Sequence, residues 1–165
     1  MSGFWGKHIE RADYLAAEAS GSRELLAFYA QLLRAQFAIY ESFRNWLPSG
    51  DLETDLAVVQ SSMPGLLECV ARHGPQSLAA EAQGLAPAVM ASELLDYWRS
   101  PLDTKFFAKS VLQPYTHWLA ETRITPVGRE LAGGERTCPF CGGKPQVSFL
   151  QAKESGAERS RLVSG

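Results

Sequence analysis

The chain has 165 residues, of which 45% are hydrophobic, and its formal net charge is −2. This length fits one domain, or one domain with a small module, and the hydrophobic fraction excludes a chain disordered throughout. The weak negative charge argues against binding to nucleic acid or to a membrane surface, so we expect no nucleic-acid partner. No apolar run approaches the ~20 residues that span a bilayer, and no apolar segment of signal-peptide type follows the first residues. We therefore expect a cytoplasmic protein without membrane insertion.

Helical periodicity dominates residues 1–123, which we predict to form a helical domain. The expected helices cover residues 7–19, 22–47, 52–62, 64–73, 76–83, 87–99 and 104–122, with Ser22, Asp51 and Asp103 as N-caps. The second has the widest apolar stripe and should lie near the centre of the bundle. That stripe runs through Leu25, Tyr29, Leu32, Gln36, Ile39 and Phe43. Pro114 should either kink the last helix or divide it into two helices near Gln113.

Residues 124–134 are predicted to be a connector, because Pro126, Gly128 and the Gly133-Gly134 pair interrupt both helical and strand patterns. In residues 135–165 we expect a partial metal-binding knuckle and a β-hairpin, with strands over residues 146–150 and 160–163. From Gly134 onward there are five Lys or Arg and three Asp or Glu, whereas the rest of the chain has eleven Lys or Arg and fifteen Asp or Glu. The predicted fold is therefore mainly α: an N-terminal helical bundle followed by a small knuckle and hairpin.

The most specific motif is Cys138-Pro139-Phe140-Cys141-Gly142-Gly143-Lys144-Pro145. Two thiolates at this spacing can meet one metal ion, and glycines after the second cysteine let backbone N–H groups turn toward the sulfurs. A dithiol redox centre is a second interpretation, although the glycines and Pro145 oppose the helix that normally lowers the pKa of such a thiol. The third interpretation is that the two cysteines are inert. The Gly-Gly-x-Pro segment favours the metal site.

Two cysteines do not complete a tetrahedral site, and none of the three histidines has metal-motif spacing to them. We expect His73 to lie near a helix end at the surface, and His117 to pack or hydrogen-bond within the last helix. Each of His8, His73 and His117 could still be called upon as a ligand, and Cys69 is predicted to be a small core residue. Phe4 and Trp5 belong to no stripe, so they either pack back on the bundle or form an exposed tip. No catalytic set or nucleotide motif is present, so apart from a redox role of the Cys138 and Cys141 pair nothing in the sequence argues for an enzyme.

Several short segments resemble the FdhE family, the formate dehydrogenase accessory (formation) proteins. They are Arg11-Ala12-x-x-Leu15-Ala16, Leu25-x-x-Phe28-Tyr29-x-x-Leu32-Leu33-x-x-Gln36, Met63-Pro64-x-Leu66-Leu67, Phe106-Phe107 with Leu112-Gln113-Pro114-Tyr115, and Cys138-Pro139-x-Cys141-Gly142-x-x-Pro145. The resemblance implies a helical domain followed by rubredoxin-like, zinc-ribbon-type metal modules. It also implies a cytoplasmic accessory protein that binds the catalytic subunit of a respiratory formate dehydrogenase during its maturation.

In that family further Cys-x-x-Cys pairs follow the first hairpin, and this chain ends about where the second pair should begin. We therefore expect either a truncated form or the loss of the later modules. With Cys138 and Cys141 as the two metal ligands of one chain, iron or zinc is expected either to be absent or to be shared in a homodimer. Two alternatives stay open: a thiol–disulfide oxidoreductase with Cys138 as the attacking thiol, and a helical interaction module with a remnant knuckle.

Overall fold

The computed structural model describes residues 3–18, 21–101, 104–128, 147–153 and 156–162, the last two segments by their backbone. It confirms a mainly helical protein. Within the described residues the helices are α1 Phe4–Glu18, α2 Arg23–Phe43, α3 Leu52–Ser61, α4 Met63–His73, α5 Gln76–Gly84, α6 Pro87–Arg99 and α7 Phe106–Thr122. None of them is both long enough and apolar enough to cross a bilayer.

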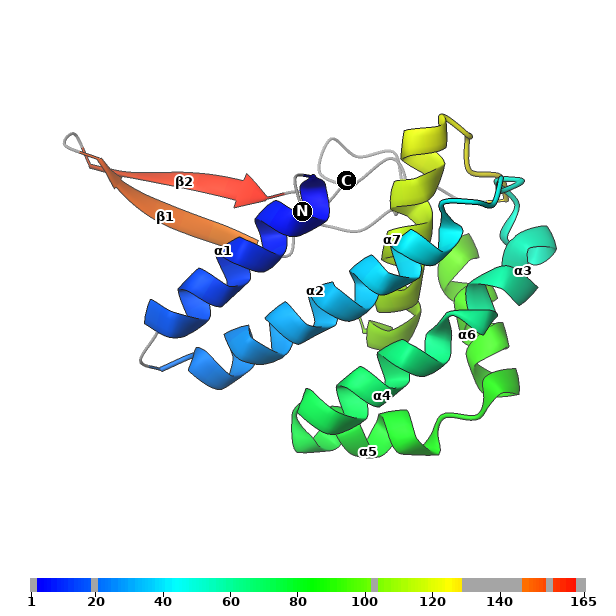
Figure 1. Cartoon of the computed structure of the whole chain (residues 1–165), viewed down its shortest axis with the longest axis horizontal. Helices are drawn as coiled ribbons and strands as arrows, with labels where there is room; N and C mark the ends of the chain where they lie inside the picture. The colour runs from blue at the N-terminus through cyan, green and yellow to red at the C-terminus, as the bar shows by residue number, and fades with distance from the viewer. Residues whose placement is uncertain (1–2, 19–20, 102–103, 129–146, 154–155, 163–165) are drawn as a thin grey trace.

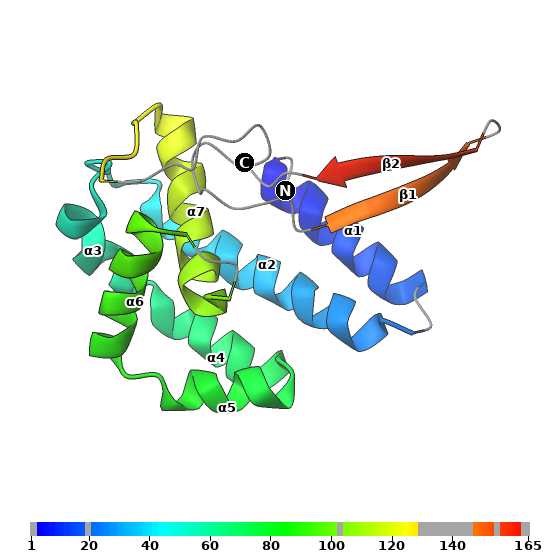
Figure 2. The ribbon, with the colours of Figure 1, turned by 180° about the vertical axis from the view of Figure 1, so that it is seen from behind.

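Helix α2 lies between two layers of the bundle, as Figures 1 and 2 show. Helix α1 packs along one side of α2, while α4 and α7 contact α2 from the other, and α7 also contacts α3 and α6. The adjacent residues Leu32 and Leu33 point into different apolar clusters. Leu32 belongs to the main core with Leu66, Leu94 and Leu119, whereas Leu33 belongs to a smaller cluster with Trp5, Ile9, Ala12 and Ala30. The central position predicted for the second helix agrees with this arrangement.

The ends of several helices differ from the sequence prediction. Helix α1 begins at Phe4 rather than at residue 7, because Trp5 is buried with Ile9 in the cluster under α1. Helix α2 ends at Phe43 rather than at residue 47. There the Trp118 indole donates a 3.0 Å hydrogen bond to the Trp46 carbonyl. The Arg44 and Trp46 N–H groups donate to the carbonyls three residues earlier, at 3.3 Å and 2.9 Å, so the regular α-helical pattern has ended there.

The predicted caps have different outcomes. Asp51 is confirmed as the N-cap of α3, where its carboxylate accepts from the Glu53 N–H. Ser22 precedes α2, but its side chain makes no capping hydrogen bond, so that part of the prediction is wrong. Asp103 lies outside the described residues, and α7 begins at Phe106 rather than at residue 104.

Leu25, predicted to face inward, is 61% exposed because the first turn of α2 extends beyond α4 and α7 (Figure 1).

Pro114 lies within one continuous helix, so the alternative of two helices meeting near Gln113 is wrong. A proline lacks the N–H that would bond the carbonyl four residues earlier, which here is the carbonyl of Ser110. The Gln36 side-chain amide of α2, which is 2% exposed, donates to that carbonyl at 2.9 Å and to the Gln113 side chain at 3.0 Å. A polar residue in the apolar stripe of α2 therefore satisfies the acceptor that Pro114 leaves free.

A buried carboxylate joins the loop after α2 to the middle of α7. Asp55, which is 5% exposed, accepts hydrogen bonds from the Ser49 N–H at 2.9 Å, the Gly50 N–H at 3.3 Å and the Tyr115 hydroxyl at 2.7 Å. Gly50 has φ of +88°, and a Cβ there would stand 2.7 Å from the Thr125 carbonyl oxygen. This loop therefore requires a glycine at residue 50.

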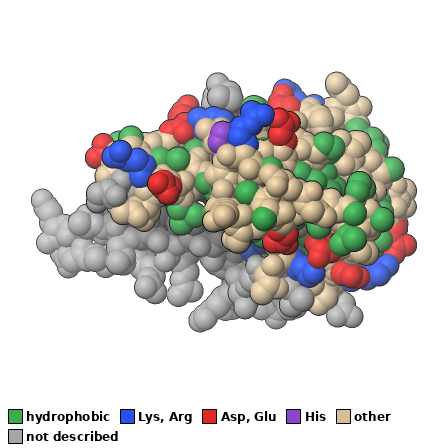
Figure 3. Space-filling view, turned by 90° about the horizontal axis from the view of Figure 1, so that it is seen from below, with side chains coloured by type: hydrophobic (Ala, Val, Ile, Leu, Met, Phe, Trp, Pro, Cys, Tyr) green, Lys and Arg blue, Asp and Glu red, His purple; other side chains and the backbone are tan. Residues whose placement is uncertain are grey.

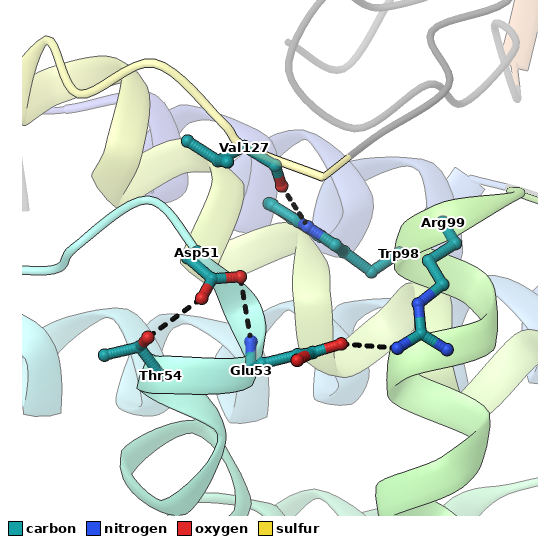
Figure 4. A network of polar contacts seen from close by, with 6 residues as sticks. All are labelled: Asp51, Glu53, Thr54, Trp98, Arg99 and Val127. Carbon is teal, nitrogen blue, oxygen red and sulfur yellow. Dashed lines mark hydrogen bonds and ion pairs between the residues drawn. The ribbon is translucent and has the colours of Figure 1, made fainter.

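The first residues of the predicted connector are fixed to the bundle. Arg123 ends α7 in the left-handed conformation with φ of +59°, and the Val127 N–H donates to the Gly50 carbonyl at 2.9 Å. Figure 4 shows the Trp98 indole donating to the Val127 carbonyl at 2.7 Å, beside an ion pair between Arg99 and Glu53. The segment up to residue 128 is thus part of the helical domain. The rest of the connector lies outside the described residues.

Two strands follow, β1 Val147–Lys153 and β2 Gly156–Leu162, which pair antiparallel with Val147 opposite Leu162 and Lys153 opposite Gly156. Residues 129–146, with the whole Cys138–Pro145 motif, lie outside the described residues. The module of knuckle and hairpin therefore stays a prediction.

On the face of the molecule seen in Figure 3, Lys and Arg side chains alternate with Asp and Glu rather than forming a continuous basic patch.

Candidate functional site

A pocket of about 540 Å³ lies where α1, α2 and α7 meet. Helix α1 contributes Phe4 and Trp5 from its first turn, α2 contributes its last turns, and α7 contributes its C-terminal half. Its side-chain lining combines rings with charged groups: Phe4, Trp5, Phe37, Tyr40, Glu41, Arg44, His117 and Glu121. Concave sites that combine aromatic walls with a few polar groups are common binding sites, so this pocket is the candidate functional site.

Phe4 lies between two imidazole rings in this pocket. Its ring centroid is 4.1 Å from that of His8 and 4.5 Å from that of His117, with interplanar angles of 35° and 30°. His117 also meets Trp5 and Tyr40 edge to face, at 5.6 Å and 5.5 Å. These contacts hold the first turn of α1 against α7. The prediction that His117 packs within the bundle is confirmed, and the possibility that Phe4 and Trp5 form an exposed tip is wrong.

The carboxylate of Glu121 is the second feature of the pocket. It accepts a short hydrogen bond from the Tyr40 hydroxyl. Burial, together with this hydrogen bond, raises the pKa of Tyr40 to about 12, so the phenol keeps its proton at neutral pH. Glu41 pairs with Arg44 at 3.3 Å on the rim, whereas Glu121 forms no ion pair within the described part of the chain. Among the described residues that line the pocket, one negative charge is therefore not balanced by a neighbouring cation.

Trp5 supplies an unusual feature of the pocket wall. Its side chain is 3% exposed, and its indole N–H is a buried polar group without a hydrogen-bond partner in the described structure. Leaving a buried donor unsatisfied costs about 1–3 kcal/mol, so such groups are rare and often mark functional sites.

The residues predicted as metal ligands are not brought together by the described part of the chain. Cys138 and Cys141 lie outside the described residues. The His8 Nδ1–H donates to the Phe4 carbonyl of its own helix at 2.7 Å, and His73 is exposed at the end of α4. Within the described segments, no group of three or more His, Cys, Asp or Glu side chains could hold a metal ion.

Cys69 is half-buried rather than part of the core, which corrects the prediction made for it. It lines a shallow pocket of about 320 Å³ on another face, between α2 and α4, with Arg72 and His73 nearby. Burial raises the pKa of its thiol, and the Arg72 charge opposes this only in part. The thiol is therefore less easily ionised than a free cysteine, which is the opposite of what a reactive cysteine needs.

The sequence did not identify the pocket as a site. Phe4 and Trp5 carried one signal, because two large aromatic residues stood before the predicted first helix with no stripe to explain them. Tyr40 carried another, since it lies at the edge of the apolar stripe beside charged Glu41. Glu121 carried none, because a glutamate near the end of a helix is ordinary. Only the crossing of α1, α2 and α7 places these groups around one space.

We expect the stability of the protein to fall between pH 7.5 and pH 5.5 through His117. Burial lowers the pKa of its imidazole below the ordinary 6.5, an effect that the Glu121 carboxylate opposes and the nearby His8 reinforces. The unfolded chain therefore binds the proton first as pH falls, so stability present above the unfolded pKa is lost below it. As the pH is lowered, the urea concentration at the midpoint of unfolding should fall less in His117→Gln than in the parent protein. Equal falls in the two proteins would contradict the assignment.

The groups around this pocket suit binding more than bond breaking. A tyrosine held in its protonated form, a neutral histidine packed among rings and a free carboxylate offer hydrogen bonds, ring contacts and one negative charge. Among the side chains that line it there is no serine, threonine or cysteine to act as a nucleophile. Comparisons of the chain with protein-family models, with curated proteins and with solved structures found no match.

Proposed function

We propose that this chain is a cytoplasmic accessory protein that binds the catalytic subunit of a respiratory formate dehydrogenase while that subunit matures. The proposal rests on the resemblance of its sequence motifs to the FdhE family, and one observation supports it. Gln36, the last residue of the motif in α2, contacts both Gln113 and the Ser110 carbonyl that Pro114 leaves free. Two motifs separated by more than seventy residues therefore meet at one buried hydrogen-bond site, as expected if the resemblance reflects one shared helical domain.

In this proposal the helical domain is the scaffold and part of the partner-binding surface, and the protein acts by binding rather than by catalysis. Cys138 and Cys141 would supply two thiolates of a rubredoxin-like, zinc-ribbon-type site. Zinc would make that site structural, while iron held by four thiolates would make it capable of electron transfer. Because one chain offers two such ligands, a homodimer would complete the site by placing the same pair from each chain around one ion.

The test is complementation together with binding. A strain that lacks its own accessory protein would receive either the parent chain or the Cys138→Ser/Cys141→Ser double variant, with formate dehydrogenase activity as the readout. A tagged copy of the chain would be used to recover the catalytic subunit. We expect the parent chain to recover the subunit and to restore activity. The double variant should bind less metal and restore less activity.

The parent form should carry one ion for every two chains if the dimer holds the site, which metal analysis and solution mass would measure together. Failure of the parent chain to recover the subunit would refute the proposal. Equal binding and equal activity in the double variant would favour a helical interaction module with a remnant knuckle. Turnover in a disulfide-reduction assay that requires Cys138 would favour the thiol–disulfide oxidoreductase instead.

A further inference from the structure

The pocket between α1, α2 and α7 has the composition of a site for an organic cation. Three of its walls are aromatic, from Phe4, Trp5 and Tyr40, and the rings of Tyr40 and Trp5 lie 6.0 Å apart. Aromatic faces attract guanidinium and ammonium groups through the negative charge above the ring. Aromatic walls alone would also accept a neutral apolar group, so the charges of the pocket must decide between the two.

The charges favour a cation. Glu41 and Glu121 supply two carboxylates and Arg44 one guanidinium, and burial keeps His117 neutral by lowering its pKa. Arg44 pairs with Glu41 on the rim. Within the described part of the chain, Glu121 bonds only the neutral Tyr40 hydroxyl, so its charge is available to a ligand. The described side chains that line the pocket therefore carry one net negative charge, and this charge is that of Glu121.

We propose that this pocket binds an arginine side chain of a partner polypeptide, with the guanidinium paired to Glu121 and lying against the ring of Tyr40. Arginine fits better than lysine because its planar group can stack on a ring and bond a carboxylate at the same time. The role of Tyr40 is to hold the Glu121 carboxylate in place, since its hydroxyl donates to one of the carboxylate oxygens. The other oxygen stays available to the guanidinium.

This inference rests on the proposed function only in requiring a polypeptide partner, whatever its identity. If the pocket binds arginine but the chain does not recover formate dehydrogenase, the arginine site is supported and the proposed partner is refuted. If the chain recovers the enzyme but the pocket does not bind arginine, the proposed partner is supported and this inference is refuted. The two failures are therefore distinguishable.

The test is a titration of the full chain with acetyl-Gly-Arg-Gly-amide, followed by NMR of the backbone amides. We expect the amides of Gly6 and Ala120, which line the pocket, to shift and to saturate at millimolar peptide, since one side chain offers only one ion pair and one ring contact. The same peptide with citrulline in place of arginine keeps the shape and removes the charge. It should shift these amides at least about five-fold less at equal concentration, which is the discrimination expected of one charge-assisted contact.

Two variants make the test specific. Glu121→Gln should weaken binding of the arginine peptide by about ten-fold, because it removes the unbalanced charge but keeps a side chain of the same size. Glu68→Gln on α4 is the matched control: Glu68 is also exposed and lies away from the pocket, so its replacement should change nothing. The spectra of the free variants report whether each is folded. Equal binding of the citrulline peptide, equal binding by Glu121→Gln, or no shift of pocket amides at ten-millimolar peptide would each overturn the proposal.

Discussion

Replacing Asp55 with alanine should lower the free energy of unfolding by about 3–5 kcal/mol, because three donors, two of them buried, lose their acceptor at once. These donors are the Ser49 and Gly50 N–H groups and the Tyr115 hydroxyl. An alanine side chain offers no acceptor, and the site, which is 5% exposed, gives water little access. Urea denaturation followed by helical circular dichroism at neutral pH is the measurement.

Tyr115→Phe is the matched control for this prediction. It removes one donor and leaves the Asp55 carboxylate bonded to the two backbone N–H groups, so it should cost only about 1–2 kcal/mol. Glu53→Ala, in the first turn of the same helix, removes an exposed ion pair with Arg99 and should cost less than about 1 kcal/mol. A loss below about 1 kcal/mol for Asp55→Ala would show that this carboxylate does not hold the loop to α7.

Leu33→Ala should cost about 2–5 kcal/mol, because its side chain is 2% exposed and fills the cluster between α1 and α2. Leu32→Ala should cost a similar amount, but through the main core between α2, α4 and α7. The two variants should differ in where protection from hydrogen exchange is lost. Leu33→Ala should expose the amides of α1 preferentially, whereas Leu32→Ala should lower protection in the main core.

Leu25→Ala is the control in the same helix. Leu25 belongs to the same sequence pattern, but its side chain is 61% exposed, so the replacement should change stability by less than about 0.5 kcal/mol. Losses below that value for both Leu32→Ala and Leu33→Ala would exclude the central position of α2. A Leu33→Ala variant that loses protection evenly over the whole chain would show instead that α1 unfolds together with the main core.

The sequence by itself determined the helical class of the protein and most of its helices. Apolar residues at three- and four-residue steps require a buried face on each helix, and Asp51, Pro64 and Pro87 mark helix starts through local geometry that involves few other residues. The observed starts of α3, α4 and α6 follow these signals. The boundaries that failed are the start of α1 at Phe4, the end of α2 at Phe43 and the start of α7 at Phe106.

Tertiary structure alone decided which residues act together. Gln36 looked like a polar interruption of an apolar stripe, and its role depends on Pro114, which lies in another helix. Asp55 lies in the first turn of α3, and it bonds the loop before that helix and Tyr115 of α7. The pocket needs the first turn of α1, the last turns of α2 and the end of α7 at one point. Contacts of this kind join residues distant in sequence, and neither periodicity nor capping contains information about them, because both depend only on near neighbours.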